Sequence, residues 1–267
     1  MSEFETIEFD VTSGVAKLTF NRPKYKNAIS LQMREELPVV IKRVATDSDI
    51  RALIITGAGG SFCAGGDIAS LYASAQRGDI AYGRKFWQDE YRLNAKIAEY
   101  PVPIVSFLQG FTMGGGVGLG CHASCRIVCE TSKIAMPECG IGLLPDVGGS
   151  LLLANAPGQL GRYLGLTGAR MGPSDAIFVG FADAFVPYEQ WDALKGTLIE
   201  TGDIDRASGF ASTAPASVMA ENQSQVDRYF RPNTLDAIAT GLRGSTDEFA
   251  QRAFKGFSRG APLAMAC

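Results

Sequence analysis

Basic clusters, long apolar runs and histidine are all scarce in this sequence of 267 residues. The 25 lysines and arginines are scattered among 28 acidic residues, and a net charge of −3 creates no field that attracts nucleic acid. No stretch reaches about 18 consecutive apolar residues, and the acidic segment 1–10 has neither the basic nor the apolar region of an export signal. We therefore expect a soluble cytoplasmic protein that binds neither nucleic acid nor membranes.

The single histidine, His122, restricts the possible nucleophilic mechanisms. A serine triad would need it as the base, and no G-x-S-x-G nucleophile elbow is present. Cys121, Cys125 and Cys129 lie close to it, but the segment after Cys125 has the pattern of a strand, so the spacing does not keep the three thiols on one face. We expect reduced thiols and no metal site.

Hydrophobic periodicity predicts a mixed α/β fold in the first half of the chain. Strands are expected at 15–21, 50–56, 103–110 and 125–130, with a helix after a cap at Ser30 and another helix at 114–124. The β-branched run at 50–56 is typical of a strand buried on both faces. Alternating strands and helices of this kind form the crossover units of a sheet.

Beyond about residue 158 the pattern becomes helical. Short helices are expected at 158–168, 172–180, 188–200, 223–230, 233–242 and 245–257, and the segment 204–223, poor in large apolar residues, is expected to be an exposed connection. We therefore predict a core domain at 1–200 and a helical C-terminal region at 201–267.

Two glycine-rich turns, at 57–68 and 110–120, each follow a predicted strand and open a helix. Glycine leaves backbone N–H groups uncovered at such a position, so one amide from each turn could stabilise a single carbonyl oxygen as an oxyanion hole. The glycines could instead serve only close helix packing. A phosphate loop is disfavoured because neither turn ends in Gly-Lys-Ser/Thr, and a dinucleotide site is disfavoured because Glu138 lies at a poor strand end.

Four motifs in order, "NRPKYKNAIS", "GSFCAGGDI", "GFTMGGGVGLG" and "AMPECGIGLLPDVGGS", resemble those of the crotonase (enoyl-CoA hydratase/isomerase) superfamily. The resemblance implies a ββα spiral core, an acyl-coenzyme A substrate and no other cofactor. It places the oxyanion amides at Gly66 and Gly115, with Gly65 and Gly114 beside them as substrate-binding residues.

Within the superfamily, the sequence most resembles the 3-hydroxyisobutyryl-CoA hydrolase branch. The hydratases carry one catalytic glutamate where this chain has Gly118, and a second where it has Glu138. The hydrolase branch has lost the first of these and carries an aspartate that corresponds to Asp146. The resemblance also places Glu90 in the acyl pocket, although an exposed helical carboxylate is the alternative. Glu138 and Asp146 are flanked by apolar residues, which should raise their pKa values.

The resemblance further implies contacts to coenzyme A from Lys24, Ala28, Ala64 and Asp67, and assembly as a homo-oligomer. It also predicts a shortened helical C-terminal region, because the branch continues beyond the segment that resembles 257–267. The leading hypothesis is hydrolysis of a short 3-hydroxyacyl-CoA such as 3-hydroxyisobutyryl-CoA, as valine breakdown requires. The alternatives are an enoyl-CoA hydratase or isomerase that uses Glu138 alone, and a non-catalytic acyl-CoA binding subunit.

Overall fold

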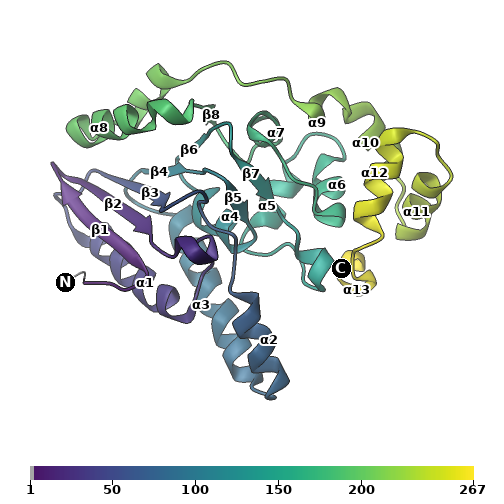
Figure 1. Cartoon of the computed structure of the whole chain (residues 1–267), viewed down its shortest axis with the longest axis horizontal. Helices are drawn as coiled ribbons and strands as arrows, with labels where there is room; N and C mark the ends of the chain where they lie inside the picture. The colour runs from purple at the N-terminus through teal and green to yellow at the C-terminus, as the bar shows by residue number, and fades with distance from the viewer. Residues whose placement is uncertain (1–2) are drawn as a thin grey trace.

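The computed structural model describes residues 3–267, and its centre is a six-stranded sheet with the strand order β1-β2-β3-β4-β6-β8 (Figure 1). The first two strands pair antiparallel and the others pair parallel. The strands are β1 (Ile7–Thr12), β2 (Val15–Phe20), β3 (Ala52–Gly57), β4 (Ile104–Phe107), β6 (Cys125–Val128) and β8 (Ala184–Phe185). The mixed α/β prediction is confirmed. All six residues of β3 are buried, as its β-branched run indicated.

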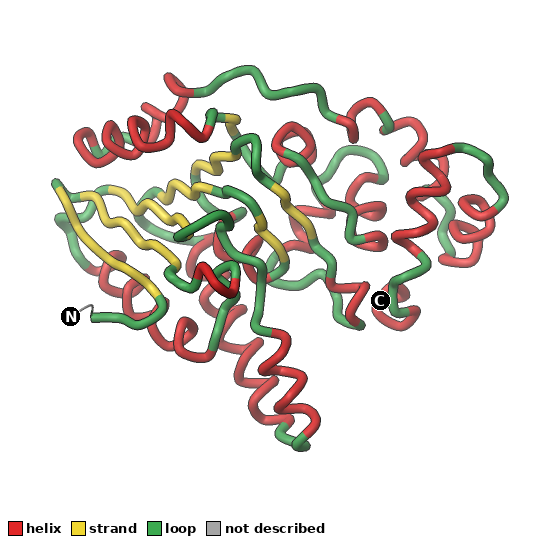
Figure 2. The backbone as a smooth tube through the Cα atoms, in the orientation of Figure 1, coloured by secondary structure: helices red, strands yellow, loops and turns green. Residues whose placement is uncertain are grey.

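A second, two-stranded sheet lies beside the first and was not predicted (Figure 2). It pairs β5 (Phe111–Met113) in parallel with β7 (Lys133–Ala135), and Cys63 bridges to Thr112 within it. The second glycine-rich turn, at 110–120, follows the main-sheet strand β4 and contains β5. This small sheet left no signal in the sequence, because three-residue strands among glycines carry almost no periodicity.

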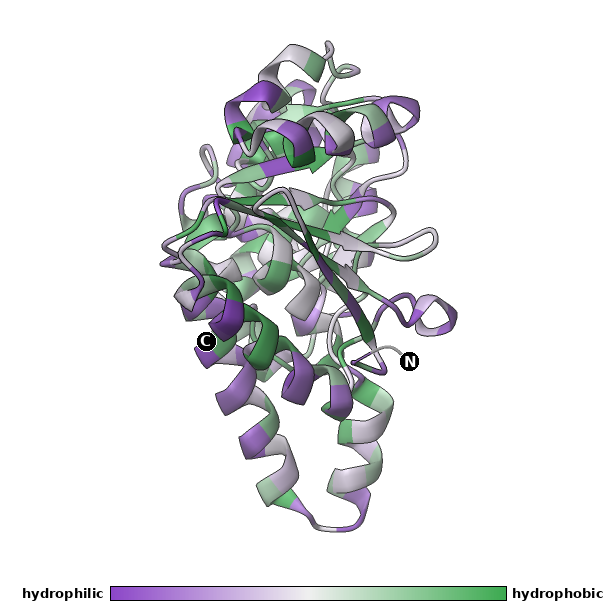
Figure 3. Ribbon diagram, turned by 90° about the vertical axis from the view of Figure 1, so that its left-hand side faces the viewer, coloured by the Kyte–Doolittle hydropathy of each residue, from purple (hydrophilic) through white to green (hydrophobic). Residues whose placement is uncertain are grey.

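The helices of the first half confirm the predicted cap at Ser30, whose hydroxyl accepts a hydrogen bond from the amide of Met33. Two of these helices form a hairpin that projects away from the rest of the chain in both Figure 1 and Figure 3. The helices are α1 (Leu31–Thr46), α2 (Ile68–Gln76), α3 (Ile80–Ala98) and α4 (Gly115–Gly120), with α2 and α3 making the hairpin.

The second half is helical, as predicted. Its helices are α5 (Gly149–Ala154), α6 (Leu160–Thr167), α7 (Pro173–Val179), α8 (Trp191–Thr201), α9 (Val218–Glu221), α10 (Gln223–Phe230), α11 (Leu235–Arg243), α12 (Glu248–Phe257) and α13 (Pro262–Ala266). In the described chain, none of the helices has both the length and the apolar character needed to cross a membrane. The division into 1–200 and 201–267 remains a prediction.

The expected exposed connection at 204–223 is only partly correct. A 3-10 helix occupies Ile204–Phe210, and α9 begins at Val218, so irregular chain is confined to the intervening residues. Asp175 of α7 fixes the start of α9, because its carboxylate accepts hydrogen bonds from the Ser217 hydroxyl and the Met219 amide. Because Asp175 lies more than 40 positions before α9, the local sequence gives no signal for the start of this helix.

Alternate residues of the central strands supply two separate cores. Leu53 and Ile55 of β3 belong to the larger core, which packs under α1, whereas Ile54 faces the smaller core under Trp191 and Leu198 of α8. Apolar strands accordingly lie inside the layers of helices (Figure 3). The two glycine-rich turns lie where the larger core meets the second sheet.

A buried asparagine joins the loop after β2 to the glycine-rich turn after β3. The Asn27 side chain is fully buried, its Nδ2 donates to the carbonyls of Ala58 (3.0 Å) and Ser61 (2.7 Å), and its Oδ1 accepts from the amide of Arg22 (2.8 Å). Its φ of 55° is one that asparagine tolerates better than most residues.

We predict that Asn27→Ala lowers the free energy of unfolding by about 2–4 kcal/mol, because two buried carbonyls and one amide lose their partner. Urea unfolding measures the effect. Asn155→Ala, at an exposed asparagine, is the matched control and should change stability by less than about 0.5 kcal/mol. Equal effects of the two substitutions would contradict the proposed anchoring.

Candidate active site

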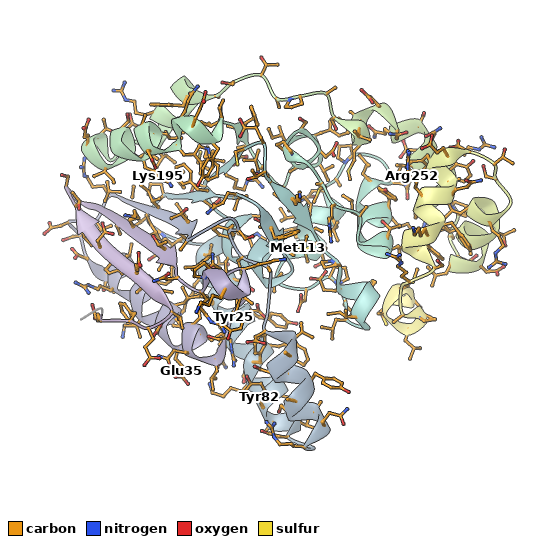
Figure 4. All side chains as sticks on the ribbon, viewed as in Figure 1. Tyr25, Glu35, Tyr82, Met113, Lys195 and Arg252 are labelled. Atoms are coloured by element: carbon orange, nitrogen blue, oxygen red, sulfur yellow. The ribbon has the colours of Figure 1, made fainter. Side chains whose placement is uncertain are left out.

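The two glycine-rich turns meet at a cavity of about 90 Å³, together with α3 and the 3-10 helix Glu138–Ile141. Met113, labelled near the centre of Figure 4, is one of the lining residues. The others are Ala64, Gly65, Gly66, Ile68, Leu71, Phe86, Trp87, Glu90, Gly114, Gly115, Pro137, Glu138, Ile141, Leu143 and Asp146. The cavity is far smaller than the 300–1,000 Å³ or so of pockets for drug-sized ligands, so it fits only a small group.

Glycine is required where the two turns approach each other. Gly65 has a φ of 98°, and a Cβ there would lie 2.8 Å from the carbonyl oxygen of Met113 and 3.6 Å from the nitrogen of Gly115. Gly114 has a φ of 51°, and a Cβ there would lie 2.7 Å from Oε1 of Glu138. Any side chain at either position would separate the turns or displace the glutamate.

Gly66 and Gly115 both line the cavity. Neither N–H donates a hydrogen bond to another backbone group in residues 3–267. Apolar side chains support both glycines, since a Cβ would lie 2.9 Å from the Phe86 ring at Gly66 and 2.8 Å from Cδ1 of Ile29 at Gly115. Two unused donors thus border one small space, which is the arrangement that an oxyanion hole needs.

Glu138 is the first of three carboxyl groups at the cavity. Its side chain is buried, and its Oε2 atom has no hydrogen-bond partner in the part of the chain that the structure describes. Burial, with a smaller contribution from the charge of Asp146, raises the pKa of Glu138 to about 8, although a backbone hydrogen bond opposes the rise. The carboxyl is therefore suited to gain and lose a proton near neutral pH.

Glu90, on α3, is the second carboxyl and is only 4% exposed, so the alternative of an exposed helical carboxylate was wrong. A Cβ on Gly115 would overlap its Oε1 atom, which places the carboxyl beside the Gly115 amide. Burial, together with Asp146 and Glu138, raises the pKa of Glu90 to about 8, and Arg34 opposes that rise.

Asp146, the third carboxyl, is half-buried, and its Oδ2 accepts a hydrogen bond of 2.7 Å from the hydroxyl of Tyr91. Burial raises its pKa, and the Tyr91 hydrogen bond acts in the opposite direction. Three carboxyl groups around about 90 Å³ repel one another when ionised, so the raised pKa values follow from burial and mutual repulsion together.

The residues expected to contact coenzyme A lie beside the cavity, on two paired segments. The amide of Ala64 donates a hydrogen bond to the carbonyl of Lys26, and the amide of Asp67 donates one to the carbonyl of Ile29. Ala28, Ala64 and Asp67 therefore lie on adjacent backbone segments. Lys24 is exposed on the neighbouring 3-10 helix. The Asp67 carboxylate also caps α2 through the Ser70 amide and lies 3.7 Å from Arg22, so it already has a structural role.

Sequence reasoning missed several residues next to the cavity. Tyr91 contacts Asp146 across 55 positions, and the Arg34 guanidinium lies 4.0 Å from the centre of the Phe86 ring with no hydrogen-bond partner in residues 3–267. Asn94, one helical turn after Glu90, is also buried without a side-chain partner there. The helical spacing of Glu90 and Asn94 was the only available signal, because both follow the inward face of α3.

Gly118, where the hydratases carry a glutamate, has no room for a side chain. A Cβ there would lie 2.5 Å from Nδ2 of Asn94 and 2.7 Å from Cβ of Val147. The space is thus filled from α3 on one side and by the residue after Asp146 on the other. A second catalytic carboxylate cannot occupy this position in the present packing.

A spiral α/β core that holds two free amides and buried acids at one cavity defines an enzyme of the crotonase class. A family model described as enoyl-CoA hydratase/isomerase matches residues 15–267. The chain belongs to the enoyl-CoA hydratase/isomerase family, within the crotonase superfamily.

Curated relatives carry the name of a hydrolase. The chain is 36% identical to probable 3-hydroxyisobutyryl-CoA hydrolase 3 of Arabidopsis thaliana over 246 residues, which cover 88% of this chain and 65% of the relative. It is 35% identical to the mitochondrial 3-hydroxyisobutyryl-CoA hydrolase of Xenopus laevis over 260 residues, covering 93% and 67%. The chain thus spans about two thirds of the length of these relatives.

Similar solved structures carry other names. An enoyl-CoA hydratase from Rhodobacter sphaeroides superimposes with a TM-score of 0.92 at 46% identity, covering 98% of this chain and 77% of that one. A carnitinyl-CoA dehydratase from Mycobacterium thermoresistibile gives a TM-score of 0.94 at 41% identity, with the same coverages. This chain therefore shares its fold with these structures, whereas the reaction type differs among the names of the relatives and neighbours.

We predict that Gly118→Ala lowers the free energy of unfolding by about 1–3 kcal/mol, because the added methyl group overlaps Asn94 and Val147. Urea unfolding again provides the measurement. Gly196→Ala, within α8, meets no atom within 4 Å and should stabilise the protein by about 0.5–1 kcal/mol. A neutral Gly118→Ala would show that the space around this position is open.

Proposed function

We propose that the protein hydrolyses the thioester of a short 3-hydroxyacyl-CoA such as 3-hydroxyisobutyryl-CoA. The observation that carries the proposal is that buried Glu138 and half-buried Asp146 share one small cavity with the unused amides of Gly66 and Gly115. The names of the curated relatives support the same substrate class.

The proposed reaction begins with the thioester oxygen bound by the Gly66 and Gly115 amides. These donors stabilise the negative charge that develops on that oxygen, each by roughly 3 kcal/mol. The Glu138 carboxylate either attacks the carbonyl carbon to form an anhydride or removes a proton from the attacking water. The carbon–sulfur bond then breaks, coenzyme A leaves as a thiolate that takes up a proton, and water supplies the oxygen of the product acid.

Asp146 has a separate role in the proposal. It accepts a hydrogen bond from the 3-hydroxyl of the acyl group or passes a proton to the leaving sulfur. Glu90, with its pKa of about 8, binds the acyl group from the side of Gly115. A cavity of about 90 Å³ bordered by Phe86, Trp87 and Leu143 favours a short acyl chain.

The proposed binding of coenzyme A involves the segment with Lys24 and Ala28 and the adjoining Ala64 and Asp67, outside the acyl cavity. Gly65 and Gly114 contribute backbone to the substrate site. Assembly as a homo-oligomer and a cytoplasmic location remain proposals, and the name of the Xenopus laevis relative places that protein in mitochondria.

A second candidate is hydration of an enoyl-CoA, favoured by the 46% identity to a structure titled an enoyl-CoA hydratase. The filled space at Gly118 speaks against it, because addition of water normally uses two carboxylates and only Glu138 stands at a hydratase position. Consumption of an enoyl-CoA without release of free thiol would favour this candidate.

We predict that Glu138→Gln and Asp146→Asn each lower the rate of thiol release from 3-hydroxyisobutyryl-CoA by at least about 100-fold while coenzyme A still binds. A thiol-reactive chromophore follows the reaction, and calorimetry follows binding. The exposed carboxylate Glu248, on α12, provides the control Glu248→Gln, which should keep the full rate. Full activity of Glu138→Gln would contradict the assigned role.

The raised pKa of Glu138 predicts the pH dependence. The carboxylate is the active form, so protonation below its pKa of about 8 removes activity, and kcat/KM should rise with pH until about 8 and then level. Because Glu90 titrates in the same range, the profile of Glu90→Gln separates the two groups. A flat profile between about pH 6 and 9 would show that no such group limits the reaction.

A further inference from the structure

The residue that follows Asp146 has a strained backbone. Val147 has a φ of 49°, in the left-handed region that a β-branched residue rarely adopts, and its side chain is buried. Such strain persists only where the surrounding structure fixes the conformation, and it is found preferentially at functional sites.

His122, in the turn after α4, fixes one side of this backbone. Its Nε2 lies 2.9 Å from the carbonyl oxygen of Val147. Because a carbonyl can only accept, Nε2 carries the proton and donates. The imidazole also packs against Gly148, where a Cβ would lie 2.5 Å from Nε2. The only histidine of the chain thus binds the loop that carries Asp146.

The Val147 side chain attaches the same loop to α4. The Cβ of Val147 lies 2.7 Å from the position that a Cβ on Gly118 would take, so the two backbones are in close contact. The helix α4 begins at Gly115, whose amide borders the cavity. The Asp146 loop is therefore packed against α4, the helix that begins at Gly115.

Tyr91 fixes the Asp146 carboxylate itself. Its hydroxyl donates to the Asp146 carboxylate from α3, the helix that also carries Glu90. Neither Tyr91 nor His122 borders the cavity, so both act on the reaction only through other groups.

We propose that His122 and Tyr91 are positioning residues that clamp Asp146, with the strained Val147 held between them. The histidine fixes the peptide after Asp146, and the tyrosine fixes the carboxylate and favours its ionised form. The inference rests on the role proposed above for Asp146, but the clamp itself can be tested without any reaction.

The first test measures the clamp in the free protein. Tyr91→Phe removes the hydroxyl that stabilises the ionised carboxylate, so a carbon-13 NMR titration of the Asp146 side chain should show a higher midpoint than in the unmodified chain. His122→Ala should also raise this midpoint, because the loop moves away from Tyr91. The other groups that act on this carboxyl, Glu90 and Glu138, are present in every variant.

Tyr188→Phe is the matched control, since Tyr188 is exposed near α8 and has no contact with the cavity. It should leave the Asp146 midpoint unchanged. An unchanged midpoint in Tyr91→Phe as well would overturn the clamp.

The second test measures turnover of 3-hydroxyisobutyryl-CoA. We expect Tyr91→Phe and His122→Ala to lower kcat/KM by about 10- to 100-fold, the effect of a small misplacement of a catalytic group. His122→Gln keeps an N–H donor and should stay within about threefold of the unmodified protein. Placed on Asp146→Asn, Tyr91→Phe should cause no further loss, because the carboxylate it orients is already gone.

The outcomes separate the two proposals. Full turnover by His122→Ala, or an equal loss in His122→Gln, would overturn the clamp while leaving the hydrolase proposal intact. Full turnover by Asp146→Asn, combined with the raised midpoint in Tyr91→Phe, would overturn the role of Asp146 in the reaction and support the clamp as a structural fact.

Discussion

The close approach of two backbone turns is the constraint on which the site depends. Gly65 and Gly114 allow the segments to come within contact, with a Cβ on Gly65 only 3.6 Å from the nitrogen of Gly115. The second sheet contributes to this approach, since the bridge between Cys63 and Thr112 pairs the first turn with β5, the strand that precedes Gly114. Asn27 anchors the first turn through its hydrogen bonds to the carbonyls of Ala58 and Ser61. The glycines thus serve packing and amide exposure at once, so the two explanations of their abundance are not exclusive.

The gathering of three carboxyl groups, two buried and one half-buried, around one cavity follows from the same geometry. With glycine at 114 and 115, the carboxyls of Glu138 and Glu90 come directly against the backbone that presents the amides. Burial disfavours the charged forms of Glu138 and Glu90, and neighbouring charges raise the cost of ionising these acids. Arg34, stacked on Phe86 behind Glu90, offsets part of that cost. A cavity built this way stabilises negative charge at the amides and makes negative charge unfavourable at the acids.

Much of the fold could be predicted because its signals are local. The buried run of β3, the Ser30 cap and the helices beyond residue 158 all follow from periodicity and capping. Family resemblance identified Glu138 and Asp146, which do lie in one cavity. The contacts of Tyr91 and His122 could not be predicted, because each depends on a partner 25 or more positions away that only the folded chain brings near. The strain at Val147 leaves no mark on sequence patterns either.

Position 118 and the Asp146 loop constrain each other through their packing. Val147 and Asn94 occupy the space that a glutamate at 118 would need, so that glutamate and this loop conformation exclude each other. Glycine at position 118 is compatible with the left-handed turn at Val147 and with the place of Asp146 at the cavity. Restoring a carboxylate at 118 would displace Val147, release its carbonyl from His122 and withdraw Asp146 from the site. A single substitution therefore cannot convert this arrangement into that of a two-carboxylate hydratase, since the loop after Glu138 would have to be rebuilt with it.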